Sequence, residues 1–378
     1  LETVGLYPKH DQVQPYQRHR VDGTRWDFAV ALRRRHSFQI DLTKLYLVYP
    51  MNEQATRKVI VMRLGYDVIG DIHGHADKLE GLLESMGYAR TGSGYRAPHG
   101  RQAVFLGDLI DRGPDQVRVL SIVRSMVDSG AARCILGNHE FNAIGYLTDD
   151  PGKPGEAYRP NRVETPKAIK NRKQHAEFLA QVGEGSASHQ DWVRWFRTLP
   201  VCLDLDGVRV VHGGWDDGSV AALQSAGWVD GVALDDALLH LAYDEEGAVG
   251  KARKRLTCGL ELALPQGRFI RDKAGHEHQD VRVADWRYEA TDFSQVALVP
   301  PGQEELLDGM DWPAGLELRP IEGSPILIGH HWFQGVPKVE CPKLACLDWS
   351  AAKDGPLVAY RWDGEDELSD EKLFWVQA

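Results

Sequence analysis

Four short blocks rich in glycine, aspartate and histidine each follow an apolar run of this chain. They are Gly70-Asp71-Ile72-His73-Gly74, Gly107-Asp108-Leu109-Ile110-Asp111-Arg112-Gly113, Gly137-Asn138-His139-Glu140 and His212-Gly213-Gly214. Carboxylate oxygens and imidazoles bind divalent metals, and two such ions about 3.5 to 4 Å apart can clamp a phosphate. The residue types therefore predict a two-metal site that acts on a phosphoester.

The first three blocks lie in an alternation of strand and helix patterns. We expect strands at residues 66–69, 103–106 and 133–136, with helices at 77–86 and 115–127 between them. Units of this kind predict parallel strands with right-handed crossovers. Ligands gather at the carboxyl ends of such strands, where each of these blocks is expected to lie.

The later part of the chain predicts a cap and a second set of strands. A breaker cluster at 149–155 and helical patterns around 167–182 and 189–197 indicate a helical cap insertion near residues 148–198. Strands at 201–205 and 208–211, joined by the hairpin turn Asp206-Gly207, would deliver His212 to the site. Further strands are expected at 325–328, 344–347 and 357–362.

The composition is that of a globular protein, with 43% hydrophobic and 26% charged residues in 378. The net charge of −11 argues against a nucleic-acid surface, because phosphate backbones are bound by clustered lysine and arginine. Five cysteines without C-x-x-C spacing favour neither a disulfide framework nor a zinc ribbon, so we expect reduced thiols and a cytoplasmic location. No apolar run approaches the roughly 20 residues of a membrane helix, and no membrane partner is expected.

The order and content of the blocks resemble the metallophosphoesterases of the protein serine/threonine phosphatase (calcineurin-like) superfamily, which includes diadenosine tetraphosphatases. The resemblance runs from about Tyr66 to Trp362, and the closing runs 346–350 and 357–362 look like the terminal hairpin of this family. It implies an α/β fold, a four-layer α/β/β/α sandwich of two mixed sheets flanked by helices. It also implies two divalent metal ions, with manganese first and iron or zinc as alternatives.

Carried over by motif, the resemblance implies six metal ligands. Asp71 and His73 would hold the first metal, Asp108 would bridge, and Asn138, His212 and His330 would hold the second. We choose His330 over His331 because it directly follows the glycine and because alternate residues of an extended segment face opposite sides. His331 is then either a substrate contact or a surface residue.

The same resemblance implies an acid and an anion-binding group. His139 resembles the histidine that protonates the leaving oxygen, and Asp111 resembles the carboxylate that orients this imidazole. Arg112 resembles the arginine that grips the phosphoryl oxygens with its planar fork of donors. A water shared between the two metals would attack phosphorus. For a second phosphate-binding arginine, Arg282 and Arg287 both stay open.

The first 61 residues differ in charge from the rest. They carry seven arginines and three lysines against six acidic residues, a net charge of +4, which leaves −15 for residues 62–378. We interpret residues 1–61 as an amino-terminal extension that is poorly ordered or not native. Residues 62–378 are then the metallophosphoesterase domain with its cap.

We expect an enzyme whose partner is a phosphorylated substrate, a phosphoprotein or a small phosphoester. The first expectation is a phosphomonoesterase of the serine/threonine phosphatase type. A dinucleoside polyphosphate hydrolase, acting on diadenosine tetraphosphate, is the alternative within the same chemistry. A non-catalytic phosphoprotein-binding scaffold is the alternative from another class, and the intact metal ligands together with His139 and Arg112 argue against it.

Overall fold

The computed structural model describes residues 65–377 except 266, 272–276, 301 and 308, and before residue 65 it describes only strand segments. Those segments form one six-stranded sheet. They are β1 (Gln12–Val13), β2 (Gln17–Val21), β3 (Thr24–Arg34), β4 (Ile40–Asp41), β5 (Lys44–Val48) and β6 (Val59–Arg63). The remaining positions of the predicted extension lie outside the described residues, and its interpretation as an extension stays a prediction.

A five-stranded mixed sheet carries the first three blocks. Its order is β11-β10-β7-β21-β22. The strands are β7 (Gly65–Ile69), β10 (Arg101–Phe105), β11 (Ala132–Cys134), β21 (Leu357–Trp362) and β22 (Leu373–Val376). Strands β7, β10 and β11 are parallel, as the alternation of strands and helices predicted, and β21 and β22 are antiparallel additions at the other edge.

A second, four-stranded mixed sheet carries the later histidines. Its order is β12-β13-β19-β20, with strands β12 (Cys202–Asp204), β13 (Arg209–Val211), β19 (Ile326–Ile328) and β20 (Leu344–Cys346). The predicted hairpin turn is present between β12 and β13, where Asp206 and Gly207 have φ angles of +56° and +131°. Two positive φ angles in succession are what the tightest hairpin turns require, which explains the Asp-Gly pair.

The two sheets face each other through one apolar core. Alternate residues of the strands point into it, among them Val68, Val104, Val210, Leu327 and Tyr360. Residues of the opposite parity, such as Ile69, Phe105 and Ile328, belong to the core on the outer faces. A period of two along each strand gives both faces an apolar layer, because neither face meets water.

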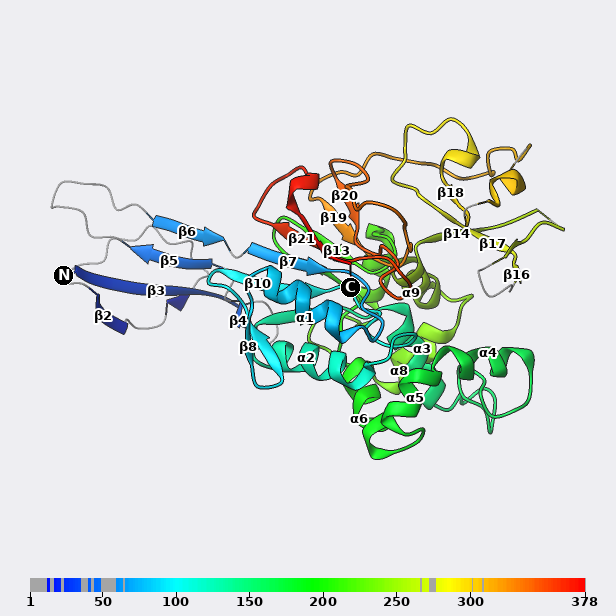
Figure 1. Cartoon of the computed structure of the whole chain (residues 1–378), viewed down its shortest axis with the longest axis horizontal. Coiled ribbons are helices and arrows are strands. Elements are labelled where there is room, and N and C mark those ends of the chain that lie inside the picture. The colour runs from blue at the N-terminus through cyan, green and yellow to red at the C-terminus, as the bar shows by residue number, and fades with distance from the viewer. Residues whose placement is uncertain are drawn as a thin grey trace.

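Helices cover the outer faces of both sheets (Figure 1). Helices α1 (Ala76–Ser85) and α2 (Gln116–Asp128) lie against the five-stranded sheet, and α3 (Asn138–Leu147) begins at the third block. Helices α7 (Asp217–Ser225), α8 (Asp236–Tyr243) and α9 (Ala248–Cys258) contribute to the core over the four-stranded sheet. The predicted four-layer α/β/β/α sandwich is confirmed.

Three helices occupy the segment predicted to be a cap. They are α4 (Pro166–Gln174), α5 (Ala176–Val182) and α6 (Ala187–Phe196), and Figure 1 shows them on one side of the sheets, beside α3. Within the described residues, no helix has the length and apolar character to cross a membrane. The five cysteines are all free.

Part of the later chain forms small structures that the sequence did not predict. A three-stranded sheet of β14 (Leu260–Ala263), β17 (Asp280–Val283) and β18 (Ala297–Leu298) has its own apolar cluster. Short pieces complete the fold: β8 (Ala89–Thr91), β9 (Gly94–Arg96), β15 (Ile270–Arg271), β16 (Glu277–His278), and 3-10 turns at Phe293–Gln295, Glu304–Leu307 and Asp370–Lys372.

Of the predicted terminal hairpin, the structure has only a single antiparallel bridge, between Asp348 and Leu357. Strand β20 belongs to the four-stranded sheet and β21 to the five-stranded sheet, so the chain crosses between the sheets after Cys346. Leu347 and Trp349 of the crossing segment are buried between the sheets. The hairpin partner of β21 is β22. The sequence of two neighbouring apolar runs is the same whether they pair with each other or join separate sheets. Their pairing depends on strands that are distant in the sequence.

Candidate metal centre and active site

The proposed ligands lie just beyond the ends of strands from both sheets. Asp71 follows β7, Asp108 follows β10, and Asn138 opens α3 after β11. His212 directly follows β13, and His330 comes two residues after β19. Parallel strands end at the same edge, so the two sheets deliver all five side chains to one end of the sandwich.

Asp108 lies between two groups of potential ligands. Its Oδ2 is 3.5 Å from Nε2 of His73, while its Oδ1 is 3.3 Å from Nε2 of His212. Possible ligand atoms of His73, Asp108 and His139 lie within 4.8 Å of one another, as do those of Asp108, His212 and His330. One carboxylate that faces a histidine with each oxygen has the geometry needed to bridge two metals.

Backbone carbonyls orient two of the imidazoles. His73 donates from Nδ1 to the Ile110 carbonyl at 2.7 Å, and His212 donates from Nδ1 to the Leu106 carbonyl at 2.8 Å. Each hydrogen bond leaves Nε2 facing the centre. Metal-binding histidines are commonly held this way, with the second ring nitrogen donating to a carbonyl.

Asn138 joins His212 and His330. Its Oδ1 accepts from Nε2 of His212 at 3.0 Å and from Nδ1 of His330 at 2.8 Å. Among the described residues, Nε2 of His330 has no hydrogen-bond partner although it is buried. An amide oxygen and two imidazoles that converge in this way could hold a transition-metal ion.

Asp71 lies beside these groups, turned toward His330. Its two oxygens accept from the backbone N–H of His330 at 3.3 and 3.2 Å. A Cβ at Gly329 would come within 2.2 Å of Oδ1 of Asp71, so a glycine is required for this approach. The first block and the late histidine therefore touch across 259 residues.

The two adjacent histidines point to different places. His331 donates from Nε2 to the Gly213 carbonyl at 2.8 Å and packs against Trp286. Only 1% of its surface is exposed, so the surface alternative for His331 is wrong. Burial, followed by the charge of Arg282, lowers the pKa of His331 to about 3. Its hydrogen bond is with the backbone, whereas His330 contacts Asn138.

The charges at the centre fit divalent cations. Burial, followed by the negative charge of Asp348, raises the pKa of Asp71 well above its usual value, so the carboxylate needs a nearby cation to ionise fully. Burial opposes charge on His212, but Asp108 and Asp71 outweigh it and raise its pKa to about 10. A metal ion at Nε2 of His212 would replace that proton.

The proposed acid and its carboxylate are in direct contact. His139 donates from Nδ1 to Oδ2 of Asp111 at 2.5 Å, and both residues are buried. Burial would raise the pKa of Asp111, but the neighbouring imidazoles of His175 and His139 lower it overall. The opposite ring nitrogen of His139, Nε2, lies 3.8 Å from Asp108 and so faces the metal ligands.

In this structure, Arg112 donates to the imidazoles of His73 and His139. Its Nη1 is 2.9 Å from Nε2 of His73, and its Nη2 is 3.4 Å from Nε2 of His139. Since Nε2 of His73 is the nitrogen that a metal would take, Arg112 must turn away when a metal binds. Within the described part of the chain, the side-chain hydrogen bonds of Arg112 go to these two imidazoles and not to a carboxylate. A phosphoryl group could then supply its counter-charge.

The two candidate arginines of the later chain differ in position. Arg282 donates from Nη1 to the carbonyl of His330 at 3.0 Å, next to the centre. Arg287 is paired with Glu340 at 3.2 Å, and 41% of its side chain is exposed. Only Arg282 is therefore near a proposed metal ligand.

Sequence reasoning missed two residues that support the site. Glu140 accepts N–H groups of Asp108, Leu109 and Gly137 at 2.8, 2.8 and 3.1 Å, which holds the second block against the third. Burial, followed by the charge of Asp108, raises the pKa of Glu140 to about 7. The second residue, His175 of the cap, bonds Asp111 over 64 positions, and no local signal indicates such a pair.

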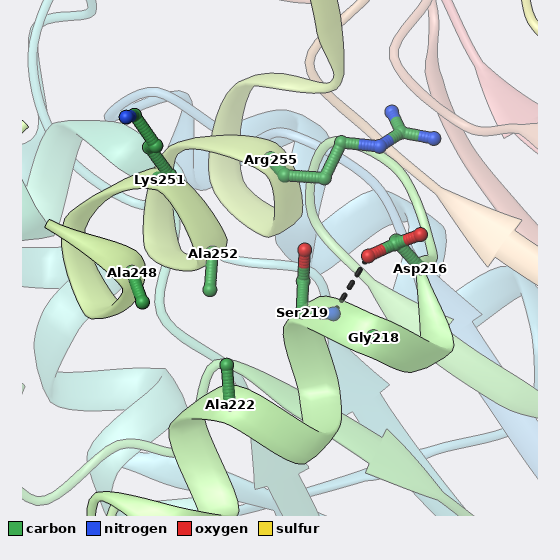
Figure 2. A pocket seen from close by; sticks show the side chains of 8 residues that line it. All are labelled: Asp216, Gly218, Ser219, Ala222, Ala248, Lys251, Ala252 and Arg255. Atoms are coloured by element: carbon green, nitrogen blue, oxygen red, sulfur yellow. Dashed lines mark hydrogen bonds between the residues drawn. The ribbon is translucent and has the colours of Figure 1, made fainter. Parts of the chain in front are cut away.

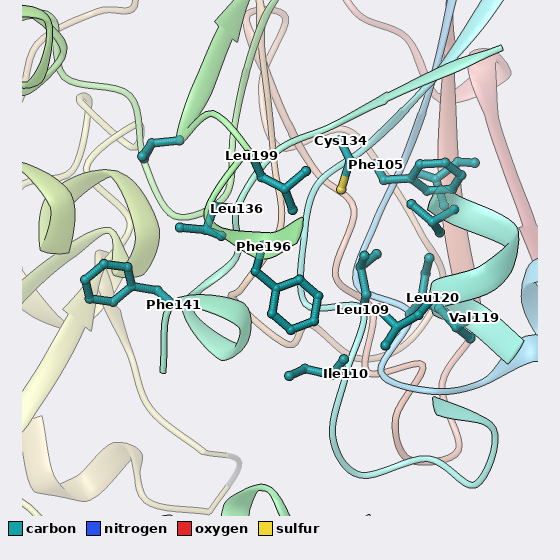
Figure 3. Packing of buried hydrophobic residues seen from close by; sticks show 14 of the residues in the cluster. Phe105, Leu109, Ile110, Val119, Leu120, Cys134, Leu136, Phe141, Phe196 and Leu199 are labelled. Atoms are coloured by element: carbon teal, nitrogen blue, oxygen red, sulfur yellow. The ribbon is translucent and has the colours of Figure 1, made fainter. Parts of the chain in front are cut away.

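The turn of the second block is anchored by its own apolar residues. Leu109 and Ile110 are fully buried and belong to the core that includes Val119, Leu120 and Phe196 (Figure 3). Asp111 and Arg112 follow in the left-handed region, with φ of +72° and +70°. Burial of Leu109 and Ile110 holds the backbone of Asp111 and Arg112 in this unusual conformation.

A hollow on the surface lies apart from these ligands, between α7 and α9 (Figure 2). It is lined by Asp216, Gly218, Ser219, Ala222, Ala248, Lys251, Ala252 and Arg255. Asp216 caps α7 by accepting from the backbone N–H of Ser219 at 2.6 Å. None of the predicted site residues lines this hollow.

Comparison with known proteins adds three likenesses. The chain is 29% identical over 150 residues to a bis(5'-nucleosyl)-tetraphosphatase of Oceanobacillus iheyensis, covering 39% of this chain and 55% of the relative. It is 34% identical over 110 residues to the Bacillus subtilis bis(5'-nucleosyl)-tetraphosphatase, covering 29% and 45%. The chain thus spans about half the length of these curated relatives. A protein serine/threonine phosphatase from Saccharomyces cerevisiae has a TM-score of 0.41 at 15% identity, covering 83% of this chain and 79% of that one.

A family model also matches the chain. The calcineurin-like phosphoesterase model matches residues 66–252, which include the four blocks and the cap but not His330. By this match, the part of the chain from residue 66 to residue 252 belongs to the calcineurin-like phosphoesterase family.

Proposed function

We propose that this chain hydrolyses phosphoesters at a two-metal centre. The observation that carries the proposal is the position of Asp108, which directs one oxygen to His73 and the other to His212. Asp71 and His73 would hold the first metal, Asn138, His212 and His330 would hold the second, and Asp108 would be shared between the two groups. The mixture of nitrogen and oxygen donors suits manganese first, with iron or zinc as alternatives.

The bound metals would polarise the phosphoryl group and lower the pKa of water. The residues of the chain supply the rest of the chemistry. His139 carries a proton toward the leaving oxygen, with Asp111 accepting from its other ring nitrogen. Arg112 turns from the imidazoles to the phosphoryl oxygens, where its planar donors stabilise the charge of the transition state. Arg282 is the better supported candidate for a second such contact.

For the substrate we propose a phosphomonoester first, of the kind removed by serine/threonine phosphatases. The guanidinium groups beside the centre, those of Arg112 and Arg282, are enough for a single phosphoryl group. The second candidate is a dinucleoside polyphosphate, which is favoured by the names of the two bis(5'-nucleosyl)-tetraphosphatase relatives. The net charge of −11 opposes a highly anionic substrate. A non-catalytic scaffold would have no use for an acid beside a metal centre.

A substrate panel tests the proposal. The chelated protein, reloaded with manganese, is assayed on an aryl phosphate, phosphopeptides, a bis-aryl phosphate and diadenosine tetraphosphate. Preference for phosphopeptides supports the first candidate, and selective cleavage of the dinucleotide reverses the order. Asp108→Asn is the matched control, since it keeps the shape of the bridging residue and should impair the binding of both metals. If the reloaded protein hydrolyses none of these substrates, the proposed function is wrong.

A further inference from the structure

The cap brings a second histidine to the carboxylate of Asp111. His175 lies at the junction of α4 and α5 and is fully buried. Its Nδ1 is 3.0 Å from Oδ1 and 2.9 Å from Oδ2 of Asp111. Because an ionised carboxylate only accepts hydrogen bonds, Nδ1 carries the proton and shares it between the two oxygens.

The Asp111 carboxylate depends on this contact for its orientation. Among the described residues, the side chains that donate to it are the imidazoles of His139 and His175. The N–H of His175 bridges both oxygens and so restrains the plane of the carboxylate, while His139 contacts Oδ2 alone at 2.5 Å. Without His175 the carboxylate could turn about its last side-chain bond.

Stability is a weak reason for an imidazole at this position. The other ring nitrogen of His175, Nε2, is buried without a hydrogen-bond partner among the described residues. A buried polar atom with no partner lowers stability relative to an apolar side chain of similar volume. The reason for an imidazole at position 175 is therefore its hydrogen bond to Asp111.

We propose that His175 is a positioning residue for the phosphoester hydrolysis: it fixes the plane of the Asp111 carboxylate, which directs Nε2 of His139 at the leaving oxygen. This inference rests on the proposed function. Through His175, the cap would help to orient the general acid His139, in addition to lying beside the site.

Hydrogen bonds hold the junction of α4 and α5 in place. Arg159 donates from Nη2 to Oδ1 of Asn171 and to Oε1 of Gln174, each at 2.8 Å, and Asn171 donates to the Pro160 carbonyl at 2.8 Å. Gln174 Nε2 also lies 3.3 Å from Nδ1 of His139. This is a close contact and not a hydrogen bond, because Nδ1 already donates to Asp111. The residue before His175 thus touches the acid itself.

Apolar packing fixes the cap to the same turn. Phe178 and Phe196 of the cap belong to one buried cluster with Leu109 and Ile110 of the second block. Figure 3 shows Phe196 and Ile110 in this cluster. The cap is therefore built into the core, and His175 approaches Asp111 from a rigid support.

The test compares leaving groups. The manganese-loaded full chain and its His175→Ala variant are assayed on phenyl phosphate and on dinitrophenyl phosphate. A poor leaving group needs the proton from His139, whereas dinitrophenolate leaves without it. We expect kcat on phenyl phosphate to fall by about 10-fold to 10²-fold, with kcat on dinitrophenyl phosphate and both KM values nearly unchanged. His175→Asn, whose amide can donate to Asp111, should restore most of the loss.

The matched control is His189→Ala. His189 is equally buried in the same cap, where it accepts from the Gly185 N–H at 3.1 Å and packs against Phe178, away from Asp111. We expect equal effects of this variant on both substrates. If His175→Ala lowers kcat equally on both substrates while still binding metal, the positioning role is wrong and the proposed function survives. If the wild-type protein hydrolyses neither aryl phosphate, the phosphomonoester candidate fails and this inference fails with it, whereas the proposed function itself fails only if no substrate of the panel described above is hydrolysed.

Discussion

Five residues of the proposed site have backbone conformations that side chains normally avoid. Positive φ angles occur at His73 (+46°), Asp108 (+49°), Asp111 (+72°), Arg112 (+70°) and His330 (+67°). Each left-handed residue costs on the order of 1–3 kcal/mol, so surrounding contacts must offset the strain. The backbone hydrogen bonds to Glu140 and the burial of Leu109 and Ile110 are such contacts.

His139→Ala tests the acid at the residue scale. The imidazole is not among the proposed metal ligands, so the variant should keep its metals while losing the proton donor. We expect a fall in kcat on phenyl phosphate of about 10² to 10⁴, the range typical of general acid catalysis. Steady-state kinetics and metal content by mass spectrometry measure the two quantities. Unchanged turnover at full metal content would remove His139 from the mechanism.

At the scale of elements, the cap helices depend on buried histidines. His189 lies in α6 and accepts the Gly185 N–H with Nδ1, so a proton on Nδ1 would place two donors against each other. Burial lowers the pKa of His189 below its usual value. The unfolded chain therefore binds this proton more readily than the folded chain does. The contribution of His189 to stability is present above about pH 6.5 and is lost as the pH falls below it.

His189→Gln should make the unfolding free energy less sensitive to acid. Glutamine does not titrate, so the fall in stability below about pH 6.5 should be shallower than in the wild-type protein. Urea unfolding at a series of pH values measures the slope. His99→Gln, at an exposed position, is the control and should follow the wild-type curve. A His189→Gln curve parallel to that of the wild type would contradict this expectation.

At the scale of the whole molecule, the proposed metal ligands converge because two sheets end at the same place. The five-stranded sheet supplies Asp71, Asp108 and Asn138, and the four-stranded sheet supplies His212 and His330. Any shift of one sheet against the other would separate these groups. The apolar core between the sheets, with Tyr66, Tyr360 and Trp362, keeps them in register.

Asp67 ties three strands of the larger sheet together. It is fully buried on β7 and bonds Arg101 of β10 at 2.8 Å, Arg361 of β21 at 2.9 Å and the hydroxyl of Tyr88 at 3.0 Å. Asp67→Asn removes the negative charge that the guanidinium groups of Arg101 and Arg361 share. We expect a loss of unfolding free energy of about 3–5 kcal/mol, as for other broken buried ion pairs.

The control for this expectation uses the same arginine. Asp363 also pairs with Arg101, but 45% of its side chain is exposed. Asp363→Asn should cost about 0–1 kcal/mol, because solvent screens exposed ion pairs. Urea unfolding of both variants measures the difference. Equal losses would show that burial of Asp67 does not decide its contribution.

The sequence by itself determined the local elements and the chemistry of the blocks. The expected strand at 66–69 is β7 (Gly65–Ile69), and the expected helix at 115–127 is α2 (Gln116–Asp128). Period-two and helical patterns, together with the turn pair Asp206-Gly207, act within a few residues. Asp108, Asp111 and Arg112 of the second block also lie within a few residues of one another. Such short-range signals can be read without knowing the rest of the fold.

Only the tertiary structure decided which distant groups meet. It turned His331 toward Gly213, put β20 and β21 in different sheets, and brought His175 to Asp111. These contacts join positions far apart in the chain, and nothing in the nearby residues specifies them. Their energy comes from burial and hydrogen bonding that exist only after the sheets and the cap have packed.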